Sequence, residues 1–415
     1  MKNYFETAFD LLDRVYRKGA FLKIVLADLP ENAENRALVT KLCYGMVEGD
    51  AKYHYQIARL TQGKPLKPHV RLILKMAMYL LSDLGRPAYA TINTAVEFSK
   101  RFDKGAASGL INAVLRRFLR EEMTFVYPER RYERLSVQYS YPLFAVKRLF
   151  HTYGEEAEEI IRGGEAVNAV RFAKGVNGGE YFTEQGIEFT PSPFTNLFYA
   201  EKFSRNADYE KGIYTFQSVG SVAICDMIAP CERLLDTCAA PGGKSVYLAE
   251  KCTSVTAAEL HPHRAALIEG YAKRMGATNL TVAVKDATED REEWHSYFDA
   301  VLCDVPCSGY GVLKENPDIK LRASERDFTS LPPLQKEILT RSSTFVKSGG
   351  VLYYSTCTLF TEENDGVIAA FLKNNPDFLV EEATSPLPHK KMKYGVQFLP
   401  HDAKAGFYFA KLRKK

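Results

Sequence analysis

Two of the eight cysteines stand where a thiol could take part in chemistry. Cys307 lies in the segment DVPCSG, three residues after Asp304, and Cys357 lies in YYSTCT, at the end of an apolar run typical of a strand. Most free cysteines are inert core residues. A thiol at a strand end over a ligand pocket is different, because it can face a substrate and have its pKa lowered there. These two cysteines and the neighbouring acid are therefore candidate catalytic residues.

A glycine loop precedes them in the chain. The segment RLLDTCAAPGGK, residues 233–244, reads as a short apolar strand that ends on Asp236 and turns through Pro-Gly-Gly into a helix. Gly242 and Gly243 let the backbone approach a ligand closely, and a helix N-terminus offers free N–H groups to an anion. The loop is a candidate binding pocket, although glycine loops that merely connect a strand to a helix are common.

Four successive predicted strands end at an acid: Asp236, Glu259, Asp286 and Asp304. A single acid at a strand end could simply cap the next helix. The carboxyl ends of adjacent parallel strands share one edge of a sheet, however, so four acids form a rim of carboxylates there. Such a rim suits ribose hydroxyls, an adenine amine and a positive centre, and it repels a nucleoside triphosphate that brings no metal.

Two phosphate-binding motifs do not fit this loop. The nucleotide P-loop needs GxxxxGK[ST], and Cys238 occupies the position of its first glycine; the dinucleotide fingerprint GxGxxG does not fit CAAPGGK either. We therefore expect an adenosine-bearing cofactor without phosphates, and S-adenosyl-L-methionine meets that description. Its predicted binding residues are Cys238, Ala239, Ala240, Pro241, Gly242, Gly243, Lys244, Glu259, Asp286 and Asp304.

Each of these residues has an expected part in cofactor binding. The Pro-Gly-Gly loop and Lys244 would face the cofactor's carboxylate, and Glu259 would take the ribose hydroxyls. Asp286 would read the adenine amine, while Asp304 would lie close to the methyl-bearing end. His261 and His263 flank Pro262, but no third ligand follows at a useful spacing, so we expect no metal.

A methyl donor beside two thiols indicates a particular acceptor. Oxygen and nitrogen acceptors carry their own lone pair and need only a base. Carbon 5 of a pyrimidine becomes nucleophilic only after a thiolate adds to carbon 6, which is a case of covalent catalysis. An acid must stabilise charge at ring nitrogen 3, which suits Asp304, and a base must remove the carbon-5 proton before the thiol is eliminated. The residues thus favour cytosine methylation, but their spacing does not say which cysteine attacks.

The elements that position these residues follow residue 231. Short β-rich runs alternate with helices there, which predicts an α/β fold with a mostly parallel, doubly wound, Rossmann-like sheet. One of the helices is expected over residues 331–350, closing on Gly349 and Gly350.

The first part of the chain has a different pattern, typical of an all-helical bundle. Apolar residues recur at helical spacing from Phe5 to Tyr16, and further helices are expected over residues 34–49, 70–85, 90–102 and 108–120. Residues 1–135 hold 23 Lys and Arg against 15 Asp and Glu, a balance of +8, whereas the remainder holds 32 against 36, a balance of −4. A basic first third suggests contact with a polyanion, although an ordinary basic surface would show the same balance.

A shift in composition near residue 130 predicts a domain boundary. We expect a helical domain over 1–130, a small α+β subdomain over 131–228 and a cofactor-binding domain over 229–415. Within the middle part, helices are expected over 144–154 and 155–164, and alternating segments such as 180–193 follow.

Three segments carry a resemblance to a known family. CAAPGGK, DVPCSGYG with ENPDIK, and YYSTCTLFTEEN are similar to motifs of the RNA (cytosine-5)-methyltransferases of the NOP2/Sun class, and INAVLRRFLR and RPAYATINTAVEF resemble the NusB-like RNA-binding domain. The resemblance implies methylation of a cytosine in 16S, small-subunit ribosomal RNA. It also implies that Cys357 is the nucleophile and that Cys307 assists product release. Cytosine methyltransferases of DNA use the Pro-Cys thiol instead, so this assignment depends on the family. Glu259 stands where the family usually has Asp.

Composition limits the remaining possibilities. The N-terminus has no apolar signal-peptide core, and no run reaches membrane-spanning length, so we expect a cytoplasmic protein without membrane contact and with reduced thiols. Nothing demands more than a monomer. Two other functions remain open: a non-catalytic RNA-binding or ribosome-assembly factor, which the intact pair of cysteines disfavours, and a nucleotide hydrolase built on the GKS fragment, which Cys238 disfavours.

Overall fold

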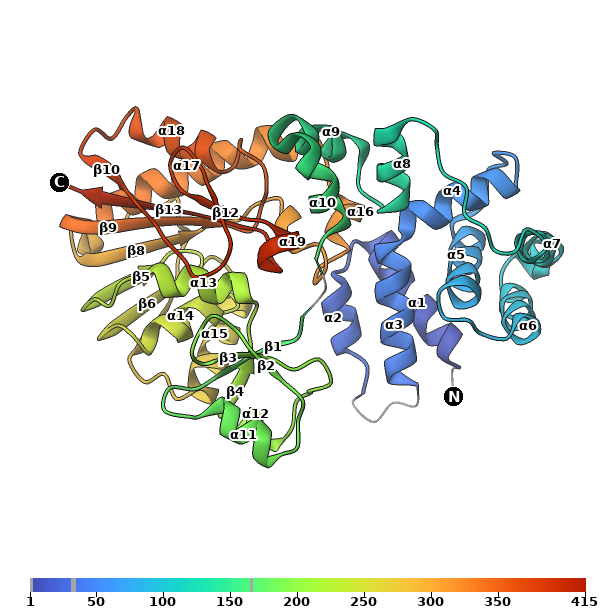
Figure 1. Ribbon diagram of the computed structural model, residues 1–415, viewed down its shortest axis with the longest axis horizontal. Helices are drawn as coiled ribbons and strands as arrows, with labels where there is room; N and C mark the ends of the chain where they lie inside the picture. The colour runs from blue at the N-terminus through green and yellow to red at the C-terminus, as the bar shows by residue number, and fades with distance from the viewer. Residues whose placement is uncertain (1–2, 31–34, 165–166) are drawn as a thin grey trace. The chain divides into compact units, whose positions relative to one another are not determined.

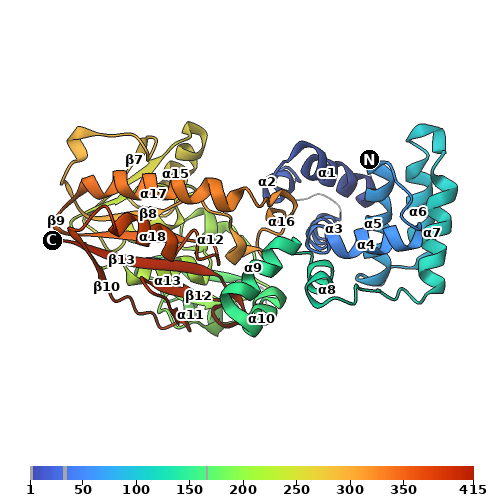
Figure 2. The same ribbon diagram turned by 90° about the horizontal axis from the view of Figure 1, so that it is seen from above.

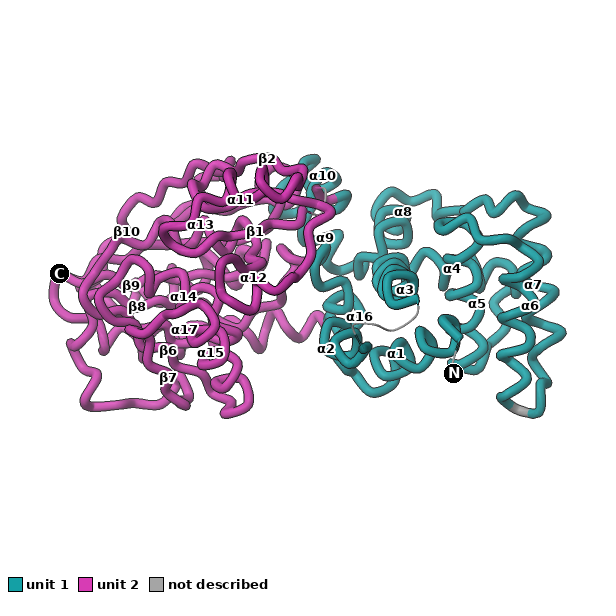
Figure 3. The backbone as a smooth tube through the Cα atoms, turned by 90° about the horizontal axis from the view of Figure 1, so that it is seen from below, with its two compact units in different colours: residues 1–162, 313–323 teal, residues 163–312, 324–415 magenta. Residues whose placement is uncertain are grey.

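The chain groups in two compact units (Figure 3). The computed structural model describes residues 3–30, 35–164 and 167–415. Unit 1 comprises residues 1–162 and 313–323, and unit 2 comprises residues 163–312 and 324–415. The three-domain division at residues 130 and 228 stays a prediction, because compactness alone does not show which parts fold independently.

Unit 1 is helical, and its first helix has the predicted amphipathic pattern. Helix α1 (Tyr4–Lys18) buries Phe5, Phe9 and Leu12 among its apolar residues. The side chain of Asn3 accepts a hydrogen bond from the Glu6 N–H and so caps the start of the helix. The other described helices of unit 1 are α2 (Leu22–Ala27), α3 (Arg36–Glu48), α4 (Asp50–Leu60), α5 (Pro68–Ser82), α6 (Ala88–Ser99), α7 (Ser108–Arg120), α8 (Arg131–Gln138), α9 (Leu143–Tyr153), α10 (Ala157–Arg162) and α16 (Ile319–Arg322).

The predicted helices of the first 120 residues are confirmed, with shifts of a few residues at their ends. Glu34, the first residue of the helix expected over 34–49, lies outside the described residues. Helix α5 is buried along almost its whole length from Val70 to Leu81, so it forms the centre of the bundle (Figure 1).

A short segment from the second half of the chain completes unit 1. Asp318, just before α16, is almost fully buried. Its carboxylate accepts a hydrogen bond from the Leu22 N–H (3.2 Å) and forms an ion pair with Arg322 (2.6 Å). Leu321 packs against the apolar core of the bundle. The ENPDIK segment is therefore part of the helical unit, which its place in the sequence does not indicate.

Unit 2 begins with a small antiparallel sheet in the order β2-β3-β1-β4. Its strands are β1 (Ala169–Phe172), β2 (Thr190–Pro191), β3 (Leu197–Tyr199) and β4 (Tyr214–Phe216), and its helices are α11 (Gly178–Glu184) and α12 (Ala207–Glu210). The alternating stretch 180–193 holds only two strand residues, because its first part forms α11. Asn177 caps that helix, and the buried Phe182 packs edge-on against Phe172 (5.0 Å between ring centroids).

A nine-stranded mixed sheet forms the rest of unit 2. The strands β9, β8, β5, β6 and β7 are neighbours in this order and run parallel, and β13, β12, β11 and β10 continue the sheet antiparallel beyond β9. Their bounds are β5 (Arg233–Asp236), β6 (Ser254–Glu259), β7 (Leu280–Val284), β8 (Phe298–Asp304), β9 (Val346–Thr356), β10 (Phe378–Glu381), β11 (Lys390–Lys391), β12 (Val396–Phe398) and β13 (Phe407–Lys414).

Helices cover both faces of this sheet, so the predicted doubly wound, Rossmann-like fold is confirmed (Figures 1 and 2). One face carries α13 (Val219–Met227), α14 (Gly243–Ala249) and α15 (Pro262–Arg274), and the other carries α17 (Asp327–Phe345) and α18 (Asp365–Leu372). Successive strand residues point to opposite faces. Accordingly, Leu302 packs in the core between the sheet and α13, while Val301 packs in the core between the sheet and α17.

The predicted end of one helix was wrong. Helix α17 ends at Phe345, and residues 346–350 belong to the irregular start of β9 rather than to a helix. The reason is long-range, since Val346 pairs with Phe298 of the neighbouring strand β8 before the register shifts. None of the helices in the described ranges combines the length and the apolar composition that a membrane crossing requires.

Candidate active site

The predicted acids lie at one edge of the large sheet. The parallel strands β8, β5, β6 and β7 are consecutive neighbours, and the first three end at Asp304, Asp236 and Glu259. Asp286 lies two residues beyond Val284, the last residue of β7. The structure therefore brings the four carboxylates to the carboxyl edge of adjacent strands, where ligands of such sheets bind.

The glycine loop joins this edge to α14. The Ala239 N–H donates to the carbonyl of Ala258 at the end of β6 (2.9 Å), which holds the loop over the neighbouring strand. Gly242 has a φ of 103°, and a Cβ there would lie 3.2 Å from Cα of Ile268 in α15. Only glycine accommodates both the left-handed backbone and the close helix. Burial raises the pKa of Cys238, so this thiol at the start of the loop stays protonated.

Three of the carboxylates each keep one oxygen without a hydrogen bond from another described residue. Asp236 accepts from the Ser245 hydroxyl through Oδ2 (2.6 Å), and its buried Oδ1 has no partner. Glu259 uses Oε1 for the His261 N–H (3.1 Å) and for Arg264 (3.3 Å).

Asp286 shows the same division of its oxygens, because its Oδ1 accepts from both the N–H (2.8 Å) and the hydroxyl (2.7 Å) of Thr288. These two bonds lower the pKa of Asp286. A ligand with several hydroxyl and amine donors fits a set of spare carboxylate oxygens, since a buried acceptor without a donor is costly. Adenosine and an amino-acid ammonium supply such donors.

Asp236 is the most buried of the four acids, with 1% of its surface exposed. Burial raises the pKa of its carboxyl group to about 7, although the Ser245 hydroxyl opposes that shift. The group is therefore partly protonated near neutral pH.

Lys244 and Asp304 form an ion pair across the rim. The Lys244 Nζ lies 2.6 Å from Asp304 Oδ2, and the Ser355 hydroxyl donates to Oδ1 of the same carboxylate at 2.6 Å. Burial lowers the pKa of Lys244, but the Asp304 carboxylate more than offsets this and raises it overall. Lys244 also interacts electrostatically with Cys357. Its side chain is thus engaged at the acid, and the sequence had suggested only a role toward the cofactor.

The two candidate thiols, Cys307 and Cys357, lie in contact with each other. Cys307 Sγ lies 3.3 Å from Cys357 Sγ, and the Cys357 N–H donates to Cys307 Sγ, also at 3.3 Å. Asp304 pairs with Ser355 where the parallel strands β8 and β9 end, and Cys307 and Cys357 each follow a few residues beyond that pair. The hydrogen bond to Cys357 and then burial raise the pKa of Cys307, so this thiol keeps its proton.

Sequence reasoning missed the residue that holds these two loops together. Glu363 is fully buried, and it accepts hydrogen bonds from the N–H (2.8 Å) and the hydroxyl of Ser308, from the Thr358 hydroxyl (3.0 Å) and from Gln335 Nε2 (3.0 Å). Ser308 follows Cys307 and Thr358 follows Cys357, so one carboxylate ties both cysteine segments. The segment TEEN offers Glu362 and Glu363 without a sign of which one turns inward.

The two histidines after β6 are His261 and His263. Their rings stack 5.5 Å apart at the start of α15. The part of the chain that the structure describes contains no group of three or more His, Cys, Asp or Glu side chains that could hold a metal ion.

Comparisons with known proteins cover the whole chain. The family model described as 16S rRNA methyltransferase RsmB/F matches residues 227–413, and the model of the NusB family matches residues 5–120. The probable ribosomal RNA small subunit methyltransferase B of Bacillus subtilis (strain 168) is 32% identical over 443 residues, which cover 99% of this chain and 98% of that protein. Ribosomal RNA small subunit methyltransferase B of Sodalis glossinidius (strain morsitans) is 29% identical, over 98% of this chain and 95% of that protein.

Solved structures share the fold. The crystal structure of PH0851 aligns with a TM-score of 0.82 and 23% identity, over 100% of this chain and 99% of that one. The structure of NSun6 from Pyrococcus horikoshii with SFG aligns with a TM-score of 0.59 and 19% identity, over 66% of this chain and 98% of that one. With a relative at 32% identity along nearly its full length and two matching family models, the chain belongs to the RsmB/F family of 16S rRNA methyltransferases, and it is an rRNA methyltransferase whose cofactor is S-adenosyl-L-methionine.

Proposed function

We propose that this enzyme methylates carbon 5 of a cytosine in 16S ribosomal RNA through a covalent adduct with Cys357. The observation that carries the proposal is the pair of thiols 3.3 Å apart next to the Lys244–Asp304 ion pair. A methyl acceptor at nitrogen or oxygen would need a base but no thiol. Two partly exposed thiols at the ligand edge of the sheet are what carbon 5 chemistry requires.

The cofactor would be held by the rim on the other side of Asp304. The spare oxygens of Glu259 and Asp286 suit ribose hydroxyls and the adenine amine, and the spare oxygen of Asp236 suits a further donor. The loop Cys238, Ala239, Ala240, Pro241, Gly242 and Gly243 allows close approach of the backbone. S-adenosyl-L-methionine supplies an electrophilic methyl group when bound.

Cys357 acts as the nucleophile in this proposal. Its sulfur bonds to carbon 6 of the flipped-out cytosine, and the electron pair of the carbon 5–carbon 6 double bond moves into the ring. Negative charge would develop at nitrogen 3, and a proton passed from the Lys244 ammonium through the Asp304 carboxyl group would neutralise it. Carbon 5 of the adduct would then carry the electron pair that takes the methyl group, and S-adenosyl-L-homocysteine would be the leaving group.

Cys307 has the second thiol role. After methylation, a base must remove the carbon-5 proton so that the carbon–sulfur bond to Cys357 can break and the aromatic ring can reform. Cys307 is within hydrogen-bond distance of the departing sulfur, and its raised pKa keeps it protonated, so it would donate its proton to the Cys357 sulfur as the carbon–sulfur bond breaks, while a separate base takes the carbon-5 proton. We assign it to this release step.

The remaining parts of the proposal concern partners and organisation. Residues 1–130 supply phosphate contacts to the RNA, and residues 229–415 perform the chemistry. The enzyme acts in the cytoplasm, where its ribosomal RNA substrate lies, and it works as a monomer without a metal ion.

A labelled methyl donor tests the chemistry directly. Unmodified 16S ribosomal RNA is incubated with radiolabelled S-adenosyl-L-methionine and with wild type, Cys357→Ala or Cys307→Ala, and the product nucleoside is identified by mass spectrometry. We expect 5-methylcytidine with wild type, no transfer with Cys357→Ala, and a denaturant-resistant protein–RNA adduct with Cys307→Ala. Methylation that survives the loss of Cys357, or a methyl group on nitrogen or oxygen, would refute the mechanism.

A further inference from the structure

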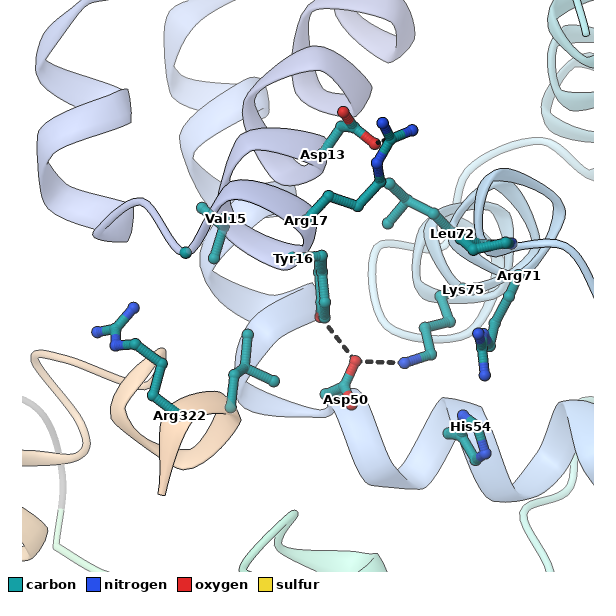
Figure 4. Close-up of a pocket in the computed structure, with 13 residues that line it drawn as sticks. Asp13, Val15, Tyr16, Arg17, Asp50, His54, Arg71, Leu72, Lys75 and Arg322 are labelled. Carbon is teal, nitrogen blue, oxygen red and sulfur yellow. Dashed lines mark hydrogen bonds and ion pairs between the residues drawn. The ribbon is translucent and has the colours of Figure 1, made fainter. Parts of the chain in front are cut away.

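Unit 1 contains a cavity of about 490 Å³. Helices α1, α4 and α5 of the bundle line it together with α16, the short helix from the ENPDIK segment (Figure 4). Its volume lies within the roughly 300–1,000 Å³ of small-molecule sites. All of these helices belong to the helical unit, so the cavity is a feature of that unit alone.

The lining of this cavity is basic. Arg17, Arg71, Lys75 and Arg322 contribute four positive charges, against two carboxylates. Apolar side chains fill the spaces between them, among them Leu72. This mixture of cations and apolar surface suits a ligand that has both an anionic group and a flat apolar part.

Internal ion pairs neutralise part of the charge. Lys75 is almost fully buried and is paired with Asp50, which also accepts a hydrogen bond from the Tyr16 hydroxyl (2.7 Å). In Figure 4 both side chains converge on Asp50. Arg17 has a looser pair with Asp13 at 3.5 Å, and its side chain is 62% exposed.

Arg322 is paired with Asp318 at 2.6 Å, so Arg71 is the remaining lining cation. Among the described residues it has neither an ion pair nor a side-chain hydrogen bond, although it is half-buried on α5 and lines the cavity beside His54 (Figure 4). Burial and then the charges of Lys75 and Arg71 lower the pKa of His54. A positive field without a matching anion thus remains at this end of the cavity.

We propose that this cavity receives one nucleotide of the ribosomal RNA substrate, with a phosphate at Arg71 and the nucleotide's apolar parts against Leu72 and its neighbours. The proposal rests on the ribosomal RNA substrate and on the basic character of the first part of the chain. Arginine is suited to phosphate because its planar fork matches two phosphate oxygens. The chain that forms α16 emerges shortly after Cys307, so a bound nucleotide would contact the segment that continues from the catalytic loop.

The test compares Arg71→Gln with a matched control, Arg130→Gln. Arg130 also belongs to unit 1, but its side chain is 85% exposed and does not line the cavity, and it lies 3.6 Å from the Glu133 carboxylate. Binding of an unmodified 16S ribosomal RNA transcript is measured by filter binding over a series of salt concentrations. A second variant, Arg17→Gln, removes another lining cation that is mostly in solvent.

We expect Arg71→Gln to weaken RNA binding by about 3- to 10-fold and to reduce the slope of log affinity against log salt by about 0.7–0.9, the value for one lost phosphate contact. Arg17→Gln should act in the same direction by a smaller factor, and Arg130→Gln should leave the slope unchanged. Equal affinity and slope for the Arg71 and Arg130 variants would overturn the proposal. Tight binding of adenosine 5′-monophosphate in the absence of RNA, with unchanged RNA affinity in Arg71→Gln, would show a free-nucleotide site instead and would also overturn it.

Two further readouts separate this proposal from the cytosine chemistry. Binding of S-adenosyl-L-methionine by Arg71→Gln, measured by calorimetry, should equal wild type and reports a folded protein. Methyl transfer by Arg71→Gln at saturating RNA should keep the wild-type kcat with a raised KM. Failure of the Cys357 mechanism would leave RNA affinity unaffected, so the two proposals fail in different measurements.

Discussion

Replacing Glu363 should disable the enzyme without touching a thiol. Its carboxylate binds Ser308 and Thr358, the residues after the two cysteines, and also Gln335. In Glu363→Ala the two hydroxyls can still pair with each other, since they already lie 2.7 Å apart. The Ser308 N–H and one Gln335 N–H cannot be rescued in this way, because the other Gln335 N–H already donates to the carbonyl of Pro306.

The cost follows from these two donors. A buried donor left without an acceptor costs about 1–3 kcal/mol, so Glu363→Ala should lose about 2–6 kcal/mol of stability. For a unit of this size that is a fall in Tm on the order of 10 °C. Glu363→Gln differs, because its carbonyl oxygen can take the place of Oε2 while its amide donates to the hydroxyl oxygens. We expect Glu363→Gln to stay within about 1 kcal/mol of wild type.

Activity should separate the two variants further. We expect the shared Glu363 carboxylate to hold the thiols at their separation of 3.3 Å, and a misplacement of about 1 Å can cost about 10²-fold in rate. We expect kcat for methyl transfer, measured well below the Tm, to fall about 10- to 100-fold in Glu363→Ala and less than about 3-fold in Glu363→Gln. Mild oxidation with diamide should link Cys307 to Cys357 rapidly in wild type and slowly in Glu363→Ala, as followed by mass spectrometry.

A neighbouring glutamate provides the control. Glu362 precedes Glu363 and is only half-buried, so Glu362→Ala should keep both the kcat and the rate of thiol cross-linking. A Glu363→Ala enzyme that is fully active and cross-links at the wild-type rate would refute the idea that this carboxylate holds the thiols together.

Three further predictions concern the cofactor side of the site. The pKa of Asp236 is raised to about 7 in the folded protein, so its contribution to the free energy of unfolding is fully present below the ordinary carboxyl pKa and is lost as pH rises through about 7. Asp236→Asn should therefore gain stability relative to wild type as pH rises toward and above about 7. Urea unfolding at pH 5 and pH 8 measures this difference. Gly242→Ala forces a side chain into a backbone with φ of 103° and toward Ile268, so it should lower stability by about 1–3 kcal/mol and weaken cofactor binding measured by calorimetry. Lys244 forms an ion pair with Asp304 at 2.6 Å, so Lys244→Met should reduce kcat more than 10²-fold while the Kd of the cofactor changes little. A large rise in the cofactor Kd with unchanged kcat would favour a role of Lys244 at the cofactor's carboxylate instead.

The fold was largely predictable because its signals are local. An apolar run followed by an acid and a turn marks the end of a strand, and this pattern placed Asp236, Glu259 and Asp304 at strand ends, as the structure has them. The errors lie where a distant partner overrides the local pattern. Val346 joins a strand rather than a helix because it pairs with Phe298, and no window of sequence around it contains that information.

The candidate active site also has a part that the sequence predicts and a part that it does not. That Cys307 and Cys357 lie together follows from two predicted strands becoming parallel neighbours, since Asp304 and Ser355 pair in the ladder and both chains leave the sheet at the same edge. Their support could not be predicted, because it depends on side chains that meet only after folding. Glu362 and Glu363 are adjacent residues of the same type, so the sequence does not distinguish them. Only the packing of the loop determines which side chain is buried.

The placement of α16 shows what such long-range packing contributes to function. The segment that follows Cys307 is part of the helical unit, where Asp318 is buried and the partly buried Leu321 packs against the apolar core. Because the chain is continuous, the loop that carries Cys307 is anchored at its far end in the unit that we propose to bind RNA. A variant that loosens this anchor, such as Asp318→Asn, removes the carboxylate that pairs with Arg322 but retains an acceptor for the Leu22 N–H. If anchoring positions the thiol loop, Asp318→Asn should lower kcat at saturating RNA while Arg71→Gln raises only KM, and equal effects of the two variants on both constants would contradict that separation.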